Sequence, residues 1–382
     1  MKAIIIGAGI GGLTTAIALQ KKGIEVEVYE AAPEIKEAGA GIWVATNAMT
    51  VMQRLGLDQE IKSAGKDLGR IAVCDTKDKI IQEIHLDKVK KKFIHGTTAI
   101  HRAKLQQILY QHTGKEKVFT GKRLKHYVEK PQGVEVYFED GSSASGDLLL
   151  GADGIRSVVR KQLLGEIPLR YSGQTCWRGI VDFVLPERYR DACTEIWGNQ
   201  KGLRAAFSQI NEKEVYFYTT CFTPPGGQDE KGKLKEKLAY LFKDFQPEVV
   251  QVLKAAMEEK IIRSDLFDFV PVKTWTKGRI ALLGDAAHAT TPNMGQGGCQ
   301  AIEDAYVIAD CLSKESAIEN ALQKYQSIRI EKARMIVNTS FMFARLTNFE
   351  SAPARAFRNA FLRMTPDFMS ERQLDKVYGL NY

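Results

Sequence analysis

The sequence GAGIGG at residues 7–12 constrains the fold of this chain more than any other feature. It follows the apolar run 2–6, which is typical of a strand buried on both faces, and it precedes segment 11–22, whose apolar residues have helical spacing. In such a strand–turn–helix unit the first glycine allows a tight turn, the second lets a phosphate approach the backbone, and the third lets helix and strand pack closely. The sequence therefore predicts a dinucleotide-binding unit, whose expected binding glycines are Gly7, Gly9, Gly11 and Gly12.

An acidic residue stands where this motif requires one. Glu30 closes the second expected strand, 25–29, at about the 20-residue spacing at which a carboxylate binds a ribose hydroxyl. The glycine motif and Glu30 do not by themselves distinguish FAD from NAD.

Length and composition exclude several classes of protein. A chain of 382 residues has room for two or three domains, and 44% hydrophobic with 26% charged residues is typical of a globular protein. No apolar run approaches the ~18 residues that span a bilayer, and the first apolar stretch is too short for a signal peptide, so we expect a cytoplasmic protein without stable membrane insertion. The six cysteines form no C-x-x-C pair and the six histidines show no ligand spacing, so we expect no metal site.

The net charge of +8 does not indicate nucleic-acid binding. The densest basic runs, 88–92 and 231–235, are not interleaved with the aromatic residues that stack on bases. We therefore expect no nucleic-acid partner and ascribe to the charge a milder attraction of anionic cofactors and substrates.

The order of predicted elements indicates a discontinuous α/β domain with an insertion. Helices are expected over 47–55, 101–109 and 297–312, a hairpin over 124–138, a buried strand over 279–283, and further helix from about 317. Strand-like segments dominate 172–272 and predict a largely antiparallel sheet. We assign residues 1–70, 100–171 and 273–345 to the first domain, 71–99 and 172–272 to the inserted sheet, and 346–382 to a C-terminal helical segment.

Two later motifs also follow expected strands. The first is the sequence GDAAH at 284–288, whose aspartate could accept hydrogen bonds from polyol hydroxyls. The glycine turn that follows it at 295–298 presents backbone N–H donors that could stabilise negative charge. The alternative for this whole region is an ordinary strand–loop–helix turn. The sequence GADGIRS at 151–157 has two interpretations as well. It is either a helix cap with Arg156 on the surface or a second contact for a dinucleotide.

Together and in this order, the three motifs resemble the single-component FAD-dependent monooxygenases, the para-hydroxybenzoate hydroxylase-like aromatic hydroxylases. The likeness covers about residues 1–345. Within that family, a few stretches are similar to the urate hydroxylase and salicylate hydroxylase-like branch. Cys299 is a departure from this similarity, because many relatives carry Asn at that position. These stretches are 30–31, 35–36, 140–147 and 295–299.

The resemblance implies an α/β fold in which a Rossmann-like FAD-binding domain carries an inserted, mainly antiparallel sheet for substrate. It implies that Glu30 binds the adenosine ribose, Arg102 the phosphate–ribityl region, and Asp285 the ribityl chain. Asp153, Arg156 and their neighbours would serve FAD and a transient nicotinamide. The loop beside the flavin pyrimidine edge would contain Gly295, Gly297 and Gly298.

In the resembling family, NADPH or NADH reduces the flavin, O2 forms a flavin C4a-hydroperoxide, and hydroxyl is transferred to an aromatic or heteroaromatic small molecule. Arg204 and Tyr216 are our candidates for catalysis, the cation holding an anionic substrate and the phenol orienting or deprotonating it. A surface arginine and a packed tyrosine are the alternative. Trp43 is a candidate wall of the flavin site or a core residue, and we expect His288 to orient its turn.

Other classes stay open at this point. The chain is alternatively an FAD-dependent dehydrogenase or reductase without oxygen insertion, or a non-catalytic flavin-fold binding protein, although the intact glycine motif and Asp285 argue against the latter. In the C-terminal segment, Phe349, Phe357, Phe361, Leu362 and Phe368 alternate with Arg355, Arg358 and Arg363. A helix that caps the FAD domain is favoured there over a membrane-surface contact, with a monomer or a homodimer both open.

Overall fold

A computed structural model describes the whole chain except residues 36–38, 201, 350, 365–366 and 381, and the side chains of 367–371. Lys36, part of the stretch 35–36, and the side chain of Phe368 therefore lie outside the described residues. In the described part of the chain, no helix combines the length and apolar character needed to cross a bilayer.

The first sheet has six strands in the order β18-β19-β12-β1-β2-β8. All neighbours from β19 to β8 are parallel, and only β18 runs antiparallel to β19. The apolar side chains of β1 are buried on both faces, as the continuous run 2–6 predicts. The strands are β1 (Lys2–Ile6), β2 (Glu25–Tyr29), β8 (Val118–Phe119), β12 (Leu148–Gly151), β18 (Thr276–Lys277) and β19 (Ile280–Leu282).

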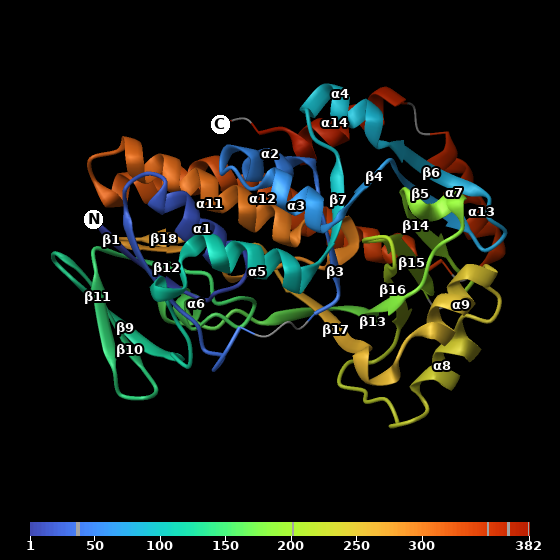
Figure 1. The fold of residues 1–382 in the computed structure, drawn as a ribbon, viewed down its shortest axis with the longest axis horizontal. Coiled ribbons are helices and arrows are strands. Elements are labelled where there is room, and N and C mark those ends of the chain that lie inside the picture. The colour runs from blue at the N-terminus through green and yellow to red at the C-terminus, as the bar shows by residue number, and fades with distance from the viewer. Residues whose placement is uncertain (36–38, 201, 350, 365–366, 381) are drawn as a thin grey trace.

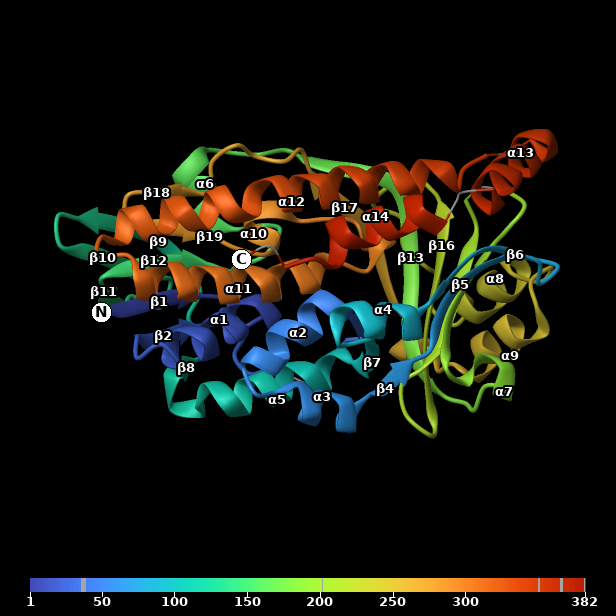
Figure 2. The ribbon, with the colours of Figure 1, turned by 90° about the horizontal axis from the view of Figure 1, so that it is seen from above.

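Helices from distant parts of the chain cover this sheet. α1 packs between α5 and α11, and the 29-residue α12 runs beside α11 along one side of the molecule (Figure 2). The helices expected over 47–55, 101–109, 297–312 and from 317 onward are confirmed. The helices of this part are α1 (Ile10–Gln20), α2 (Thr46–Arg54), α3 (Asp58–Ala64), α5 (Arg102–Thr113), α6 (Val158–Leu164), α10 (Asp285–His288), α11 (Gly297–Lys314) and α12 (Ile318–Leu346), with the 3-10 turns η1 (Lys115–Lys117) and η3 (Pro292–Met294).

The second large sheet has seven strands in the order β17-β13-β16-β15-β14-β5-β6 and lies at the opposite end of the molecule (Figure 1). Its pairs are antiparallel except β14 with β5. Together with α7 to α9 it encloses a hydrophobic core of its own. The elements are β5 (Arg70–Asp75), β6 (Ile80–His85), β13 (Leu169–Asp182), α7 (Glu187–Arg190), β14 (Ala192–Trp197), β15 (Arg204–Gln209), β16 (Glu214–Phe222), α8 (Leu234–Leu241), α9 (Pro247–Ala255), η2 (Glu258–Lys260) and β17 (Ile262–Phe269).

Two three-stranded antiparallel sheets complete the fold. The expected hairpin over 124–138 is confirmed as β9 paired with β10. Part of the range 71–99, which we assigned to the inserted sheet, does not join the seven-stranded sheet, because β7 pairs with β3 and β4 instead. The strands β5 and β6 do join it. Our division into domains remains a proposal. The strands are β3 (Gly41–Val44), β4 (Lys66–Leu68), β7 (Thr97–His101), β9 (Leu124–Lys130), β10 (Gly133–Phe138) and β11 (Ser143–Gly146), and α4 (Leu86–Phe93) connects β6 to β7.

The C-terminal segment divides between the two ends of the molecule. α14 (Asp367–Tyr378) lies against α2 and α12 of the first domain. α13 (Ala352–Arg363) lies beside β6 of the seven-stranded sheet and projects from that corner (Figure 2). The sequence-based preference for a helix that caps the FAD domain therefore holds for α14 and is wrong for α13.

Candidate active site

A cavity of about 550 Å³ lies between the six-stranded and seven-stranded sheets. Glycine turns at the carboxyl ends of parallel strands form one side of it, where α/β sheets bind ligands. The residues from that side include Gly9, Gly11, Arg102, Ala152, Gly154, Gly284, Asp285, Gly295, Gly297 and Gly298. Strands β13, β15 and β16 contribute Cys176, Arg178, Arg204, Tyr216, Tyr218 and Thr220 from the other side, and β3 contributes Trp43.

The glycine turn at 7–12 is built as its sequence predicts. Gly7 has φ +105°, and a Cβ there would lie 2.4 Å from the carbonyl oxygen of Ala152. A Cβ on Gly12 would lie 1.9 Å from the carbonyl oxygen of Gly7. A Cβ on Gly9, in contrast, would meet no heavy atom within 4 Å. Packing therefore requires Gly7 and Gly12, whereas the space beside Gly9 is left for a ligand.

Two helix N-termini open into this cavity. α1 starts after Gly9 and α11 after Gln296, and neither first turn is capped by a side-chain hydrogen bond. Free N–H groups and the helix dipole favour negative charge at such positions. Gly9 and Gly11 on α1, with Gly297 and Gly298 on α11, line the cavity, so its shape and donors fit a dinucleotide that carries a pyrophosphate.

Glu30 stabilises the glycine turn from the adjacent strand. Its carboxylate accepts hydrogen bonds from the backbone N–H groups of Ala8 at 2.8 Å and Ala32 at 2.9 Å. It lies at the end of β2 and outside the lining of the cavity. Ribose binding by Glu30 remains a prediction.

Asp285 and Arg102 face the cavity from α10 and α5. Burial raises the pKa of Asp285, although the charges of His288, Arg102 and Arg160 act in the opposite direction. Burial and the nearby Arg178 lower the pKa of Arg102, while Asp285 counteracts this effect. A carboxylate and a guanidinium are therefore held inside one cavity, which suits a ligand with both hydroxyl and phosphate groups.

The structure turns the Asp153 side chain toward α6. Its carboxylate accepts hydrogen bonds from Ser157 Oγ at 2.5 Å and from the backbone N–H groups of Val158 at 2.7 Å and Val159 at 3.1 Å. Arg156 is exposed. The helix-capping interpretation is thus confirmed for this side chain. Because Ala152 and Gly154 line the cavity instead, a cofactor contact by Asp153 stays a prediction.

Arg204 lies at the cavity wall, and each of its three guanidinium nitrogens has one partner within the protein. The side chain is 1% exposed, with Nη1 3.3 Å from Glu195 Oε1 and Nε 3.2 Å from Thr220 Oγ1. Its Nη2 donates to Asn293 Oδ1 at 2.5 Å, which links β15 to the loop before α11. Glu195 neutralises much of the guanidinium charge, so Arg204 presents an oriented hydrogen-bond donor to the cavity rather than an isolated cation.

Tyr216 and Trp43 form an aromatic corner of the cavity. Their rings meet edge to face with centroids 5.9 Å apart, and the Trp43 indole donates to Ser208 Oγ at 3.0 Å. Burial raises the pKa of Tyr216 far above its ordinary value. The phenol therefore stays protonated at neutral pH, so this geometry favours a hydrogen bond donor over a base.

Arg178 on β13 belongs to the same cavity and was missed from the sequence. Its Nε is buried without a hydrogen-bond partner, and among the described residues no carboxylate pairs with its guanidinium. It lies close enough to Arg102 to lower the pKa of that group. The available signal was a charged residue in the middle of strand-like segment 174–184, and no motif marks it.

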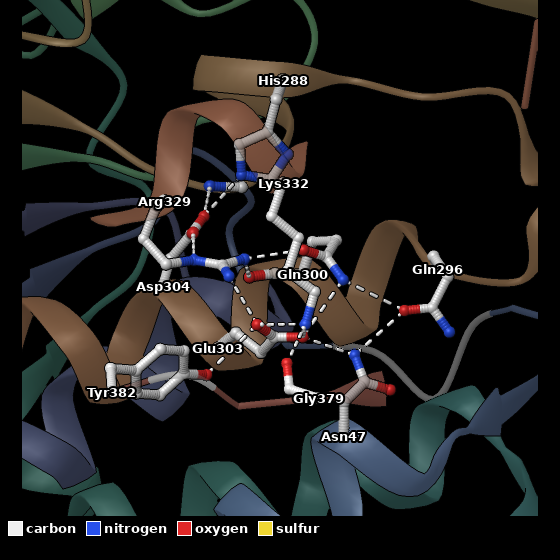
Figure 3. A network of polar contacts seen from close by, with 11 residues as sticks. Asn47, His288, Gln296, Gln300, Glu303, Asp304, Arg329, Lys332, Gly379 and Tyr382 are labelled. Atoms are coloured by element: carbon white, nitrogen blue, oxygen red, sulfur yellow. Dashed lines mark hydrogen bonds and ion pairs between the residues drawn. The ribbon is translucent and has the colours of Figure 1, made fainter. Parts of the chain in front are cut away.

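Behind the loop at 295–298 lies a buried polar network (Figure 3). Asp304 accepts hydrogen bonds from the backbone N–H of Gly284 at 2.9 Å and contacts His288 Nε2 at 2.6 Å, and Arg329 donates to it at 2.8 Å. His288 is 3% exposed and does not line the cavity. Through Asp304, His288 is linked to the backbone of Gly284, which precedes Asp285 in the turn. This position agrees with the orienting role expected from the sequence.

The same network reaches the start of α11. Glu303 accepts hydrogen bonds from Asn47 at 2.6 Å, Lys332 at 2.8 Å and Tyr382 at 3.1 Å (Figure 3). Asn47 also donates to Gln296 Oε1 at 3.0 Å. Asn47 of α2 therefore links the loop, at Gln296, to Glu303 of α11, and Lys332 of α12 and Tyr382 hold Glu303 in place.

All six cysteines are buried free thiols. Among the residues that the structure describes, no group of three His, Cys, Asp or Glu side chains is arranged to hold a metal ion.

Comparison with known proteins gives four extensive similarities. A family model described as an FAD binding domain matches residues 1–340. The aurachin C monooxygenase/isomerase of Stigmatella aurantiaca is 39% identical over 361 residues, covering 94% of this chain and 93% of that protein. The FAD-dependent urate hydroxylase of Klebsiella pneumoniae is 36% identical over 339 residues, 88% of each protein. The crystal structure of Klebsiella pneumoniae HpxO complexed with FAD and uric acid has 33% sequence identity and a TM-score of 0.91, covering 99% of this chain and 96% of that chain.

Proposed function

Because the chain belongs to the FAD binding domain family and is an FAD-dependent monooxygenase, we propose that it uses NADH or NADPH and O2 to hydroxylate an aromatic or heteroaromatic small molecule. One observation carries this proposal. A single cavity is lined by the dinucleotide-binding glycine turns on one side and by polar and aromatic side chains of the inserted sheet on the other. Relatives named for aurachin C and for urate support a heteroaromatic substrate.

The residues of the first side would hold FAD. The N-terminus of α1 would bind its pyrophosphate, Arg102 and Asp285 its phosphate–ribityl region, and the N-terminus of α11 the flavin pyrimidine edge. Bound FAD supplies the redox chemistry, since it accepts electrons from a nicotinamide and activates O2. The protein contributes the orientation of the cofactor and the substrate.

The residues of the second side would hold the substrate. Tyr216 donates a hydrogen bond from a protonated phenol, and Arg204 does so from a guanidinium fixed by Glu195 and Asn293. Arg178 adds a positive charge that no described carboxylate neutralises, so it favours a ligand with negative or carbonyl oxygen at that point.

A spectroscopic titration tests this function. We expect the purified protein, loaded with FAD, to show the two bands of oxidised flavin, to bleach with NADH or NADPH under nitrogen, and to recover in air. Addition of the correct substrate should couple O2 consumption to a hydroxylated product. Flavin that is reduced and reoxidised without a hydroxylated product from any aromatic or heteroaromatic compound would favour the reductase alternative.

Replacing Tyr216 by phenylalanine tests the substrate side separately. The ring and its contact with Trp43 remain, so FAD content should be unchanged. Loss of a hydrogen bond of about 1.5–3 kcal/mol to a charged or strongly polarised substrate should lower kcat/KM for coupled product formation by about 10–100-fold. The matched control is Tyr171→Phe, since Tyr171 lies on β13 outside the cavity and donates to the carbonyl of Thr223. Equal kcat/KM in the Tyr216 variant and the wild type would remove Tyr216 from the site.

A further inference from the structure

A buried carboxylate lies behind the cavity wall on the side of the inserted sheet. Glu195 stands on β14, is 8% exposed and does not line the cavity. Its Oε1 accepts hydrogen bonds from Trp197 Nε1 at 2.5 Å and from Arg204 Nη1 at 3.3 Å, and its Oε2 accepts one from the phenol of Tyr218. Three donors therefore converge on one carboxylate, and two of them, Arg204 and Tyr218, also line the cavity.

The hydrogen of the Tyr218 phenol points toward this carboxylate and away from the cavity. An ionised carboxylate has only acceptor sites, and the guanidinium and the indole that contact Glu195 only donate. Burial and the negative charge of Glu195 raise the pKa of Tyr218 well above its ordinary value, so the phenol keeps its hydrogen at neutral pH. Tyr218 is therefore the donor in this pair.

The oxygen of Tyr218 is consequently an acceptor toward the cavity. A phenol has one hydrogen to donate, and Glu195 holds that hydrogen. No other residue in the described part of the chain donates to this oxygen, so its acceptor capacity is left for a ligand. The ring is held in place by aromatic contacts, with centroid distances of 6.0 Å to Trp43 and 6.2 Å to Tyr216.

The neighbouring side chains of the wall are donors. A guanidinium carries five N–H groups, and the three hydrogen bonds of Arg204 to Glu195, Thr220 and Asn293 leave two for a ligand. Through its two oxygens, the carboxylate of Glu195 thus holds a donor and an acceptor next to each other on the wall. The complement of such a pair is a ligand in which an acceptor oxygen lies beside an N–H or O–H group.

We propose that Tyr218, fixed by Glu195, determines substrate specificity by accepting a hydrogen bond from a ring N–H or O–H group, while Arg204 donates to the adjacent oxygen. This inference rests on the proposed function, because that function assigns the cavity wall to an aromatic or heteroaromatic substrate. It narrows the substrate to rings with a lactam or a hydroxyl group beside a carbonyl. A ring that places an ether oxygen there would set one lone pair against another and leave the Tyr218 oxygen without a partner.

Binding of isosteric ligand pairs to the FAD-loaded protein tests this specificity. The lactam 2-quinolone and the lactone coumarin share their size and carbonyl group, but the ring N–H of the first is a ring oxygen in the second. The compounds 2-pyridone and 2-pyrone form a smaller pair of the same kind. Dissociation constants are measured from the change in flavin absorbance, without NADH or NADPH. We expect each lactam to bind at least ~10-fold more tightly than its lactone.

Two tyrosine variants on the same strand separate the acceptor from a donor. Tyr218→Phe keeps the ring but removes the acceptor, so the ratio of the two dissociation constants should fall to about one. Tyr216→Phe is the matched control. It removes a donor from the wall, so it should weaken both members of a pair and leave their ratio unchanged.

Glu195→Gln should reverse the preference. Trp197 and Arg204 still require an acceptor, so the amide oxygen should face them and the amide NH2 should face Tyr218. The phenol then accepts from the amide and turns its own hydrogen toward the cavity. The lactone should therefore bind more tightly than the lactam in this variant, a result that loss of packing alone does not produce.

Flavin content and melting temperature establish that each variant is folded. Equal binding of lactams and lactones by the wild type would overturn the proposal, and so would an unchanged ratio in Tyr218→Phe. Failure of both lactams to bind would overturn the assigned class of substrate. Because no turnover is involved, a protein that shows the expected ratios but forms no hydroxylated product would support this inference and contradict the proposed function.

Discussion

Gly12→Ala should yield a protein that neither holds FAD nor melts at the wild-type temperature. A Cβ at this position would lie 1.9 Å from the carbonyl oxygen of Gly7, and that atom belongs to the backbone of the turn itself. The turn must therefore open, and overpacking of this kind costs about 1–3 kcal/mol of unfolding free energy. We expect the dissociation constant for FAD, measured by fluorescence titration of the apoprotein, to rise at least ~100-fold, or about 2.8 kcal/mol.

Gly9→Ala is the matched variant that separates folding from binding. Its Cβ would meet no heavy atom within 4 Å, so the melting temperature of the apoprotein should stay at the wild-type value. FAD affinity should still fall, because the methyl group occupies the space through which a phosphate approaches α1. Wild-type FAD affinity in Gly9→Ala would place the pyrophosphate somewhere other than at this turn.

Arg329→Met should cause a large loss of stability although Arg329 lies outside the cavity. Glu303 and Asp304 are both fully buried and both pair with the Arg329 guanidinium. Removal of one partner leaves buried negative charge uncompensated, which costs about 3–5 kcal/mol. Urea unfolding measures this loss. The control is Arg334→Met on the same helix, where the exposed pair with Glu331 contributes no more than about 1 kcal/mol.

The same network predicts a defined dependence on pH. Burial raises the pKa of Asp304, but His288 and Arg329 together lower it further and bring it to about 2. An unfolded aspartate has a pKa of about 3.9, so the folded protein binds this proton less tightly than the unfolded chain does. The stability that Asp304 contributes is thus complete above about pH 4 and is lost as the pH falls toward 2. The difference in unfolding free energy between the wild type and Arg329→Met should shrink over this interval, and a constant difference would show that Asp304 is not the responsible group.

Several elements could be predicted because their determinants are close together in the sequence. The strand–glycine–helix unit at 2–20 depends on φ values and close contacts within one turn, and only glycine satisfies them at Gly7 and Gly12. The hairpin over 124–138 follows the same rule. The sequence also indicates Arg204 and Tyr216 as candidates for catalysis, and the structure brings both to the cavity, although their roles in catalysis remain predictions.

The sequence by itself determined the glycine turn at 7–12, the alternation of elements and the general division between a parallel sheet and an inserted antiparallel one. Only the tertiary structure decided that Arg204 pairs with Glu195 and Asn293, and that Arg178 faces the cavity without a described counter-ion. It also decided that α13 turns its phenylalanines outward. These outcomes depend on contacts between residues far apart in the chain and on strand register, where a shift of one residue reverses the direction of every side chain.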